Sequence, residues 1–111
     1  MLAMSELKEI LPHAKARFVE KMFSHNDVPT LLDDTPLTIC NRSNAKAKHD
    51  AAIARCYAFD SEFSLQTWGE VIHGTAGSEV LLYQFRFSHP MEFERTLWHE
   101  WGHLLSNKYI E

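Results

Sequence analysis

Apolar residues recur at three- and four-residue steps over residues 4–24, which is the spacing of one face of an α-helix. The positions on that face are Leu7, Ile10, Leu11, Ala14, Phe18 and Met22. Pro12 falls inside the pattern and predicts either a kink or a later helix start. Residues 25–36 follow with an Asn-Asp pair, two prolines and an Asp pair, and this composition predicts turns rather than a regular element.

The remaining segments predict a second helix, a hairpin and a last helix. Residues 37–40 form a short strand candidate, and Ser43 or Asn44 is positioned to cap a helix that runs to about Cys56. Residues 68–73 and 79–87 predict two strands of a hairpin, joined by a five-residue loop at 74–78. Along the second strand four apolar residues share one face, which predicts that it is half-buried; they are Leu81, Tyr83, Phe85 and Phe87.

The last helix is expected at residues 91–106. Pro90 suits the first helical position, and Glu92 and Glu94 lie in the first turn, where the helix dipole favours acidic side chains. The order of elements predicts an α+β fold with N-terminal helices and a small antiparallel sheet that ends in strand 79–87. The last helix is expected to pack on that sheet.

Length and composition fit one globular domain over residues 1–111, since 45% of the residues are apolar and 23% are charged. A formal charge of −4 without a basic run argues against nucleic acid as a partner. No stretch approaches the ~18 apolar residues of a membrane span, and charged residues occupy the place of an apolar signal core. Cys40 and Cys56 are too few for a disulfide framework and are interpreted as buried thiols. A cytoplasmic protein is the prediction.

The chemistry is carried by the sequence His-Glu-Trp-Gly-His at residues 99–103, an HExxH motif on the last predicted helix. At 100° per residue, His99 and His103 lie about 40° apart around the axis and one turn apart along it, so both imidazoles can bind one metal ion. Glu100 projects from the flank of that pair, where its carboxylate can act on a metal-activated water as general base and then as general acid.

The context of the motif separates it from a coincidence, which composition alone would produce at a rate of roughly 0.04 per chain. The two histidines lie opposite the centre of an apolar stripe formed by Phe93, Leu97, Trp101, Leu104 and Leu105. Gly102 costs about 1 kcal/mol in a helix interior relative to alanine, which predicts that another group approaches it closely. A metal site at His99 and His103 is therefore predicted.

The segment EFERTLWHEWGHLLS, residues 92–106, resembles the active-site helix of zincin metallopeptidases. An apolar residue precedes the first histidine, two leucines follow the second, and a strand lies just ahead of the helix, as in that family. Among zincins, the small ImmA/IrrE-like and SprT-like proteins are the most similar, although residues 79–106 assign no subfamily. The resemblance implies zinc as the cofactor, with His99 and His103 as ligands and Glu100 as the catalytic carboxylate.

The resemblance leaves the third metal ligand open. Zincins take it from downstream of the motif, and the glycine and histidine of the HExxHxxGxxH pattern are replaced here by Ser106 and Tyr109. Glu111 is the only downstream carboxylate, and on a continuing helix it would lie about 12 Å along the axis from His103. The alternatives are a third ligand from Glu111, from solvent, or from residues beyond a truncated chain, of which truncation is favoured. A peptide-deformylase arrangement with Cys56 as ligand is the weakest alternative, because the sequence around Cys56 differs from that family.

These observations predict a zinc-dependent metallopeptidase, or the N-terminal catalytic part of one, that acts on a peptide or protein. Backbone groups of strand 79–87 are expected to hold an extended peptide. The rival hypothesis is a catalytically inactive zincin-like binding or regulatory module with incomplete metal ligation. A third hypothesis is a helical interaction domain that carries the motif by chance.

The remaining candidate residues are interpreted as structural. Tyr83 is expected in the core rather than in the cleft, and Trp98 is expected to pack. His89 is expected to cap the last helix, and His73 to lie on the hairpin surface. Three further histidines are predicted to be solvated; they are His13, His25 and His49.

Overall fold

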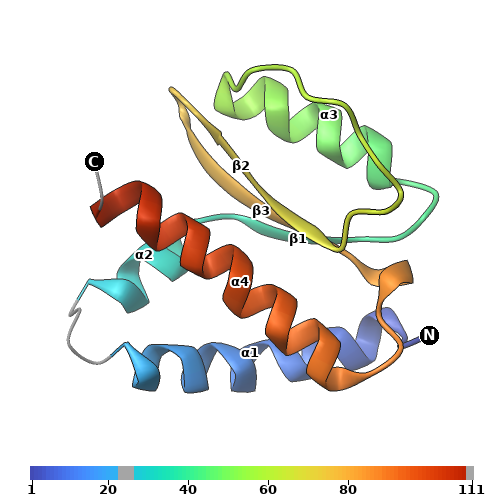
Figure 1. The fold of residues 1–111 in the computed structure, drawn as a ribbon, viewed down its shortest axis with the longest axis vertical. Coiled ribbons are helices and arrows are strands. Elements are labelled where there is room, and N and C mark those ends of the chain that lie inside the picture. The colour runs from blue at the N-terminus through green and yellow to red at the C-terminus, as the bar shows by residue number, and fades with distance from the viewer. Residues whose placement is uncertain (23–26, 110–111) are drawn as a thin grey trace.

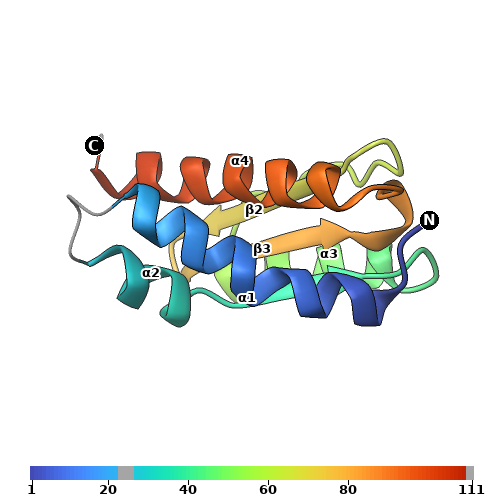
Figure 2. The same cartoon turned by 90° about the horizontal axis from the view of Figure 1, so that it is seen from below.

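Three layers make up the fold (Figure 1). The computed structural model describes residues 1–22 and 27–109, and side chains as far as residue 107. Within this part the elements are α1 (Met4–Lys21), α2 (Val28–Asp34), β1 (Leu37–Cys40), α3 (Ala45–Cys56), β2 (Gly69–Gly74), β3 (Gly77–Tyr83), a 3₁₀ turn η1 (Gln84–Arg86) and α4 (Pro90–Tyr109). Helix α3 covers one face of the sheet, and α1, α2 and α4 cover the other (Figures 1 and 2). The α+β class is confirmed.

The sheet is mixed, so the predicted all-antiparallel sheet is wrong. The strand order is β1-β3-β2, in which β1 is parallel to β3 and β2 is antiparallel to it. Parallel strands need a long crossover, which α3 and the segment before β2 provide. As a result, β3 lies in the centre of the sheet and β2 at its edge.

The central position of β3 corrects two predictions about this segment. The strand is not half-buried, because Val80, Leu82 and their neighbours face helices on both sides and have no exposed surface. The strand ends at Tyr83 rather than at residue 87, because η1 redirects the chain. Tyr83 and Phe87, predicted to share one face, therefore pack on opposite faces of the sheet. The hairpin loop has two residues rather than five, because Gly74 already pairs with Gly77.

The helices follow the hydrophobic pattern closely, with two differences. Helix α1 begins at Met4 and continues through Pro12, and its predicted end at residues 23–24 lies outside the described residues. Residues 28–34 are helical rather than turns, since Val28 and Leu32 are spaced to bury one face of a short helix that has a proline in its first turn. Helix α3 begins after Asn44, as predicted, but the Asn44 side chain makes no capping hydrogen bond to the helix.

Two clusters of buried side chains stabilise the layers. The larger lies between the sheet and α1, α2 and α4, and its members include Leu7, Phe18, Leu32, Leu82, Phe87, Phe93, Leu97 and Trp101. The smaller lies between the sheet and α3, and its members are Cys40, Ala45, Ala52, Cys56, Ile72, Leu81 and Tyr83. Both cysteines are buried free thiols, which confirms their interpretation.

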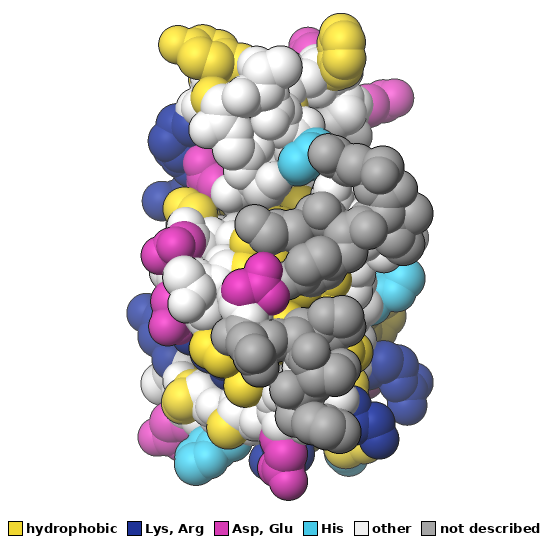
Figure 3. All heavy atoms as spheres, turned by 90° about the vertical axis from the view of Figure 1, so that its left-hand side faces the viewer, with side chains coloured by type: hydrophobic (Ala, Val, Ile, Leu, Met, Phe, Trp, Pro, Cys, Tyr) yellow, Lys and Arg dark blue, Asp and Glu magenta, His cyan; other side chains and the backbone are white. Residues whose placement is uncertain are grey.

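The described surface carries mixed charge. Figure 3 looks onto the end of the molecule where α4 and the β2–β3 hairpin end, and acidic and basic side chains are interspersed around the described part of this face. In residues 1–22 and 27–109, no helix combines the length and the apolar character that crossing a membrane requires.

Candidate metal centre

Helix α4 presents the HExxH motif in the orientation that the sequence predicts. Phe93, Leu97, Trp101 and Leu104 are buried against α1 and the sheet, with at most 4% of each exposed. The two histidines of the motif lie on the exposed side of the helix. The apolar stripe therefore fixes the rotation of α4 about its axis, and this rotation directs the histidines outward.

The imidazoles of His99 and His103 converge on one another. Their Nε2 atoms are 3.0 Å apart, within the distance at which one ring N–H donates to the other ring nitrogen. The ring centroids lie 4.5 Å apart at an interplanar angle of 85°. Two nitrogens bound to one tetrahedral zinc at about 2.0–2.1 Å each would lie roughly 3.3 Å apart. The observed spacing therefore fits a shared metal ion with only a small outward movement of the rings.

Glu100 differs from the histidines in its burial. Only 6% of the residue is exposed, although the neighbouring His99 and His103 are exposed. Within the described residues its carboxylate makes no hydrogen bond or ion pair. Burial raises the pKa of Glu100 to about 7, the positive charge of His103 lowers it, and the negative charge of Glu70 raises it further. A carboxylate with this pKa can accept a proton near neutral pH and release it again.

The edge strand β2 explains the burial of Glu100. Helix α4 approaches β2 at Gly69, where an added Cβ would lie 3.0 Å from Cγ2 of Thr96. Glu100 is four residues after Thr96, so both side chains lie on the same side of α4, towards β2. The adjacent residue of β2, Glu70, is the source of the repulsion that Glu100 experiences. The candidate site therefore lies between the exposed side of α4 and the sheet edge.

A third protein ligand is not found within the described part of the chain. No group of three or more His, Cys, Asp or Glu side chains there is arranged to hold a metal ion. Glu111, the predicted downstream candidate, lies outside the described residues. Cys56 lies in the α3 cluster and donates to Glu79 at 3.7 Å, so the deformylase-like arrangement is not formed.

Gly102 corrects one prediction. An added Cβ at this position would meet nothing within 4 Å in the described structure, so no part of the described fold approaches it. The open space lies over the same exposed side of α4 that carries His99 and His103. A helix backbone without side-chain cover at this position leaves room for a ligand beside the histidines.

The predictions for the other histidines are mostly correct, with one exception. His13 is exposed, and His73 is exposed on the hairpin; both follow the prediction. His89 accepts a hydrogen bond from a backbone amide of the first turn of α4, so it acts as a cap. His25 lies outside the described residues. His49, predicted to be solvated, is fully buried.

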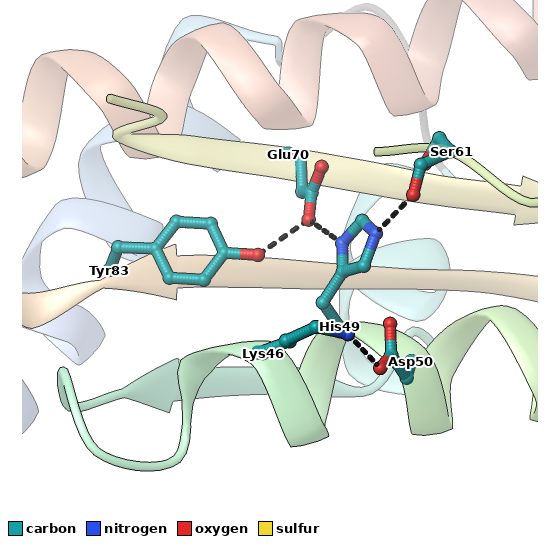
Figure 4. A network of polar contacts seen from close by, with 6 residues as sticks. All are labelled: Lys46, His49, Asp50, Ser61, Glu70 and Tyr83. Atoms are coloured by element: carbon teal, nitrogen blue, oxygen red, sulfur yellow. Dashed lines mark hydrogen bonds and ion pairs between the residues drawn. The ribbon is translucent and has the colours of Figure 1, made fainter. Parts of the chain in front are cut away.

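His49 belongs to a polar network on the α3 side of the sheet (Figure 4). Its Nδ1–H donates to Oε1 of Glu70 at 2.5 Å, and its Nε2–H donates to the carbonyl of Ser61 at 3.0 Å. The hydroxyl of Tyr83 donates to the same oxygen of Glu70 at 2.5 Å. Burial lowers the pKa of His49, but the hydrogen bonds to Ser61 and Glu70 raise it more, and the net shift is upward. Both ring nitrogens therefore carry protons in this arrangement.

Sequence reasoning missed this network because its members come from three elements and an irregular segment. Two signals were available. His49 shares one helix face with Ala45, Ala52 and Cys56, all of which are buried. Glu70 is a charged residue at the same alternating position of β2 as the buried Ile72. Tyr83 lies in the core, as predicted, and on the opposite face of the sheet from α4. It is therefore not available to the candidate site on α4.

Comparisons with known proteins do not assign this arrangement. No protein-family model, curated protein or solved structure matches the chain. The functional argument therefore rests on the geometry of His99, Glu100 and His103.

Proposed function

We propose that the chain is a zinc-dependent metallopeptidase, or the N-terminal catalytic part of one, with a zincin-like site on α4. The observation that carries the proposal is Glu100, a buried carboxylate with no hydrogen-bond or ion-pair partner in the described residues. It lies directly beside two imidazoles whose Nε2 atoms converge to 3.0 Å. A buried, unpaired carboxylate is costly to stability. A catalytic role next to a metal ion gives a reason for keeping it there.

Each residue of the motif has a defined task in this proposal. His99 and His103 hold the ion through Nε2, since neutral imidazole is a common zinc ligand. Zinc held there would supply Lewis acidity for a peptide carbonyl and for water. Glu100 would accept the proton of the attacking water and transfer it to the leaving amine. Its pKa of about 7 in the metal-free protein comes chiefly from burial, and a bound cation would lower it.

Strand β2 replaces strand 79–87 as the candidate peptide-binding element. The earlier prediction is wrong because β3 is paired on both sides, by β1 and by β2. In the antiparallel ladder, the backbone amide of Tyr83 bonds the carbonyl of Trp68, so hydrogen-bonded pairs recur at every second residue from there. The backbone groups of Gly69, Val71 and His73 consequently point away from β3. An extended peptide added at this edge would pass alongside α4.

An inactive metal-binding module is the second candidate function. The observation in its favour is that the described residues bring together two metal ligands and not three. Two imidazoles with solvent can bind zinc weakly without completing a catalytic site. This alternative shares the metal with the first proposal and differs from it in turnover.

The test combines metal content with cleavage. Zinc is measured by elemental analysis of protein purified without a His-tag, in the wild type and in His99→Ala, His103→Ala and Glu100→Gln. His13→Ala is the matched control, because His13 is an exposed histidine of α1 without a partner in the described residues. Cleavage is followed with dye-labelled denatured casein. We expect near one zinc per chain in the wild type, Glu100→Gln and the control, loss of zinc in both motif histidine variants, and cleavage by the wild type and control only.

The outcomes separate the hypotheses. Equal zinc in all five proteins would overturn the metal site and leave the motif as a coincidence. Zinc that depends on His99 and His103 without cleavage by the wild type would overturn the enzyme and favour the inactive module. Cleavage that survives in Glu100→Gln would overturn the assigned role of Glu100.

A further inference from the structure

A second feature of α4 lies beside the candidate metal centre. A groove of about 530 Å³ runs between α1 and α4 and is lined by Arg17, Met91, Glu94, Arg95 and Trp98. Figures 1 and 2 show α1 lying alongside α4. The volume falls in the range of small-ligand sites and can accept one or two amino-acid side chains.

Two apolar side chains, Met91 and Trp98, line the groove. Met91 is 59% exposed. Trp98 is partly buried, and its Nε1–H donates to the carbonyl of Ala14 at 3.3 Å. Its ring packs edge-on against Phe18, with 5.6 Å between the ring centroids. Because the indole N–H is already bonded, the part of the ring that lines the groove offers apolar contact.

Among the described residues, the charges around the groove leave one cation without a partner. Arg17 donates to Glu94 through two hydrogen bonds of 2.8 and 2.6 Å, so these two charges compensate each other. Arg95 makes no hydrogen bond or ion pair within the described residues. The groove is therefore apolar with one available guanidinium, and a carboxylate is the complementary group.

The groove is close to the motif along the helix. Arg95 precedes His99 by four residues, which places it one turn away, about 6 Å along the axis and about 40° around it. The groove lies on the side of α4 that faces α1, whereas β2 lies on the side of Thr96. A peptide that crosses the exposed side of α4 over the two histidines can therefore place a neighbouring side chain in the groove.

We propose that this groove binds a bulky apolar side chain of an acidic peptide. Met91 and Trp98 contact the apolar side chain, and Arg95 pairs with a carboxylate next to it in the peptide. The inference rests on the proposed function in taking a peptide as the ligand. It extends that function to a substrate class, which is a peptide with a large apolar residue adjacent to Asp or Glu.

The test measures binding without cleavage. Three peptides are titrated calorimetrically into Glu100→Gln protein: acetyl-Ala-Phe-Glu-Ala-amide, the same peptide with Lys in place of Glu, and the same peptide with Ala in place of Phe. Further variants in this background are Arg95→Gln and Met91→Gln. Lys8→Gln is the charge-matched control, since Lys8 is exposed on α1 and has no partner in the described residues.

We expect the Phe-Glu peptide to bind about fivefold more tightly than the Lys analogue, which is the size of one favourable exposed ion pair. It should also bind more tightly than the Ala analogue, because that peptide loses the apolar contact with Met91 and Trp98. Arg95→Gln should remove the preference for Glu over Lys, and Met91→Gln should reduce the preference for Phe over Ala. Lys8→Gln should change neither. Added salt should weaken binding of the Phe-Glu peptide more than that of the Lys analogue, because the Arg95 contact is exposed.

Two results would overturn the inference: equal affinity for all three peptides, or the same loss in Lys8→Gln as in Arg95→Gln. The zinc and casein measurements report separately on the proposed function. A wild type without zinc and without cleavage that keeps the Arg95-dependent preference would overturn the enzyme and support the groove. A zinc-dependent protease that binds the three peptides equally would support the enzyme and overturn the groove.

Discussion

Replacement of Glu100 by glutamine should stabilise the metal-free protein, and this effect should depend on pH. The carboxylate is buried without a partner in the described residues, and its pKa is raised from 4.5 to about 7, chiefly by burial. Each pKa unit corresponds to 1.36 kcal/mol, so ionising Glu100 in the folded state costs about 3 kcal/mol once the pH is well above 7. Glutamine has nearly the same shape and is never charged.

The sign follows from proton linkage. Between pH 4.5 and 7 the folded state binds more protons at Glu100 than the unfolded state does, so the free energy of unfolding falls as pH rises. The penalty is absent below pH 4.5 and complete above pH 7. Glu100→Gln should therefore match the wild type near pH 4 and exceed its free energy of unfolding by about 2–3 kcal/mol at pH 8.

The assay is urea denaturation followed by tryptophan fluorescence at several pH values in the presence of a chelator. The difference between variant and wild type is used, because it cancels the titration of other groups. Glu9→Gln is the control, since Glu9 is exposed on α1 and has no partner in the described residues. Added zinc should reduce the difference, because a nearby cation stabilises the ionised carboxylate. A pH-independent difference, or an equal one in Glu9→Gln, would refute the reasoning.

Three further substitutions test other parts of the structure. His49→Leu should lower the free energy of unfolding by about 2–3 kcal/mol at pH 6, because it removes two hydrogen bonds and leaves Glu70 without its imidazolium. That loss should shrink as pH rises through the raised pKa of His49, because the wild type then loses the stabilisation that the imidazolium gives. Equal losses at pH 6 and pH 9 in urea denaturation would contradict this network. Gly102→Ala should raise the free energy of unfolding by up to about 1 kcal/mol with unchanged zinc content, because the added methyl meets nothing within 4 Å; a lower thermal midpoint would show that the position is not open. Gly74→Ala should lower the free energy of unfolding by about 2 kcal/mol or more, because its Cβ would lie 2.1 Å from the carbonyl oxygen of Cys56, and a denaturation midpoint like that of the wild type would contradict this contact.

Local patterns in the sequence were sufficient for the helices and for the outward direction of the motif histidines. The three- and four-residue spacing of apolar side chains in α1 and α4 reflects burial of one helix face, and that face is buried in the structure. The spacing of His99 and His103 places them on one side of α4 for the same geometric reason. These features depend on residues within a few turns of each other, which is the range over which a periodic pattern carries information.

Strand pairing, by contrast, depended on partners distant in the chain. The alternation within residues 79–87 is compatible with an edge strand or a central one, and only the insertion of β3 between β1 and β2 decides between them. Because of this pairing, the strand whose free edge can bind a peptide is β2 and not the predicted strand 79–87. The same pairing also turns Glu70 towards His49, a residue 21 positions earlier in the chain.

The chemical character of Glu100 was decided by tertiary structure as well. The motif by itself identifies the carboxylate and its neighbours on the helix. Its pKa of about 7 comes from burial of α4 against β2 and from the charge of Glu70 on that strand. A helical pattern fixes which side chains share a face, whereas the dielectric and the charges that surround a face are set by the elements packed against it.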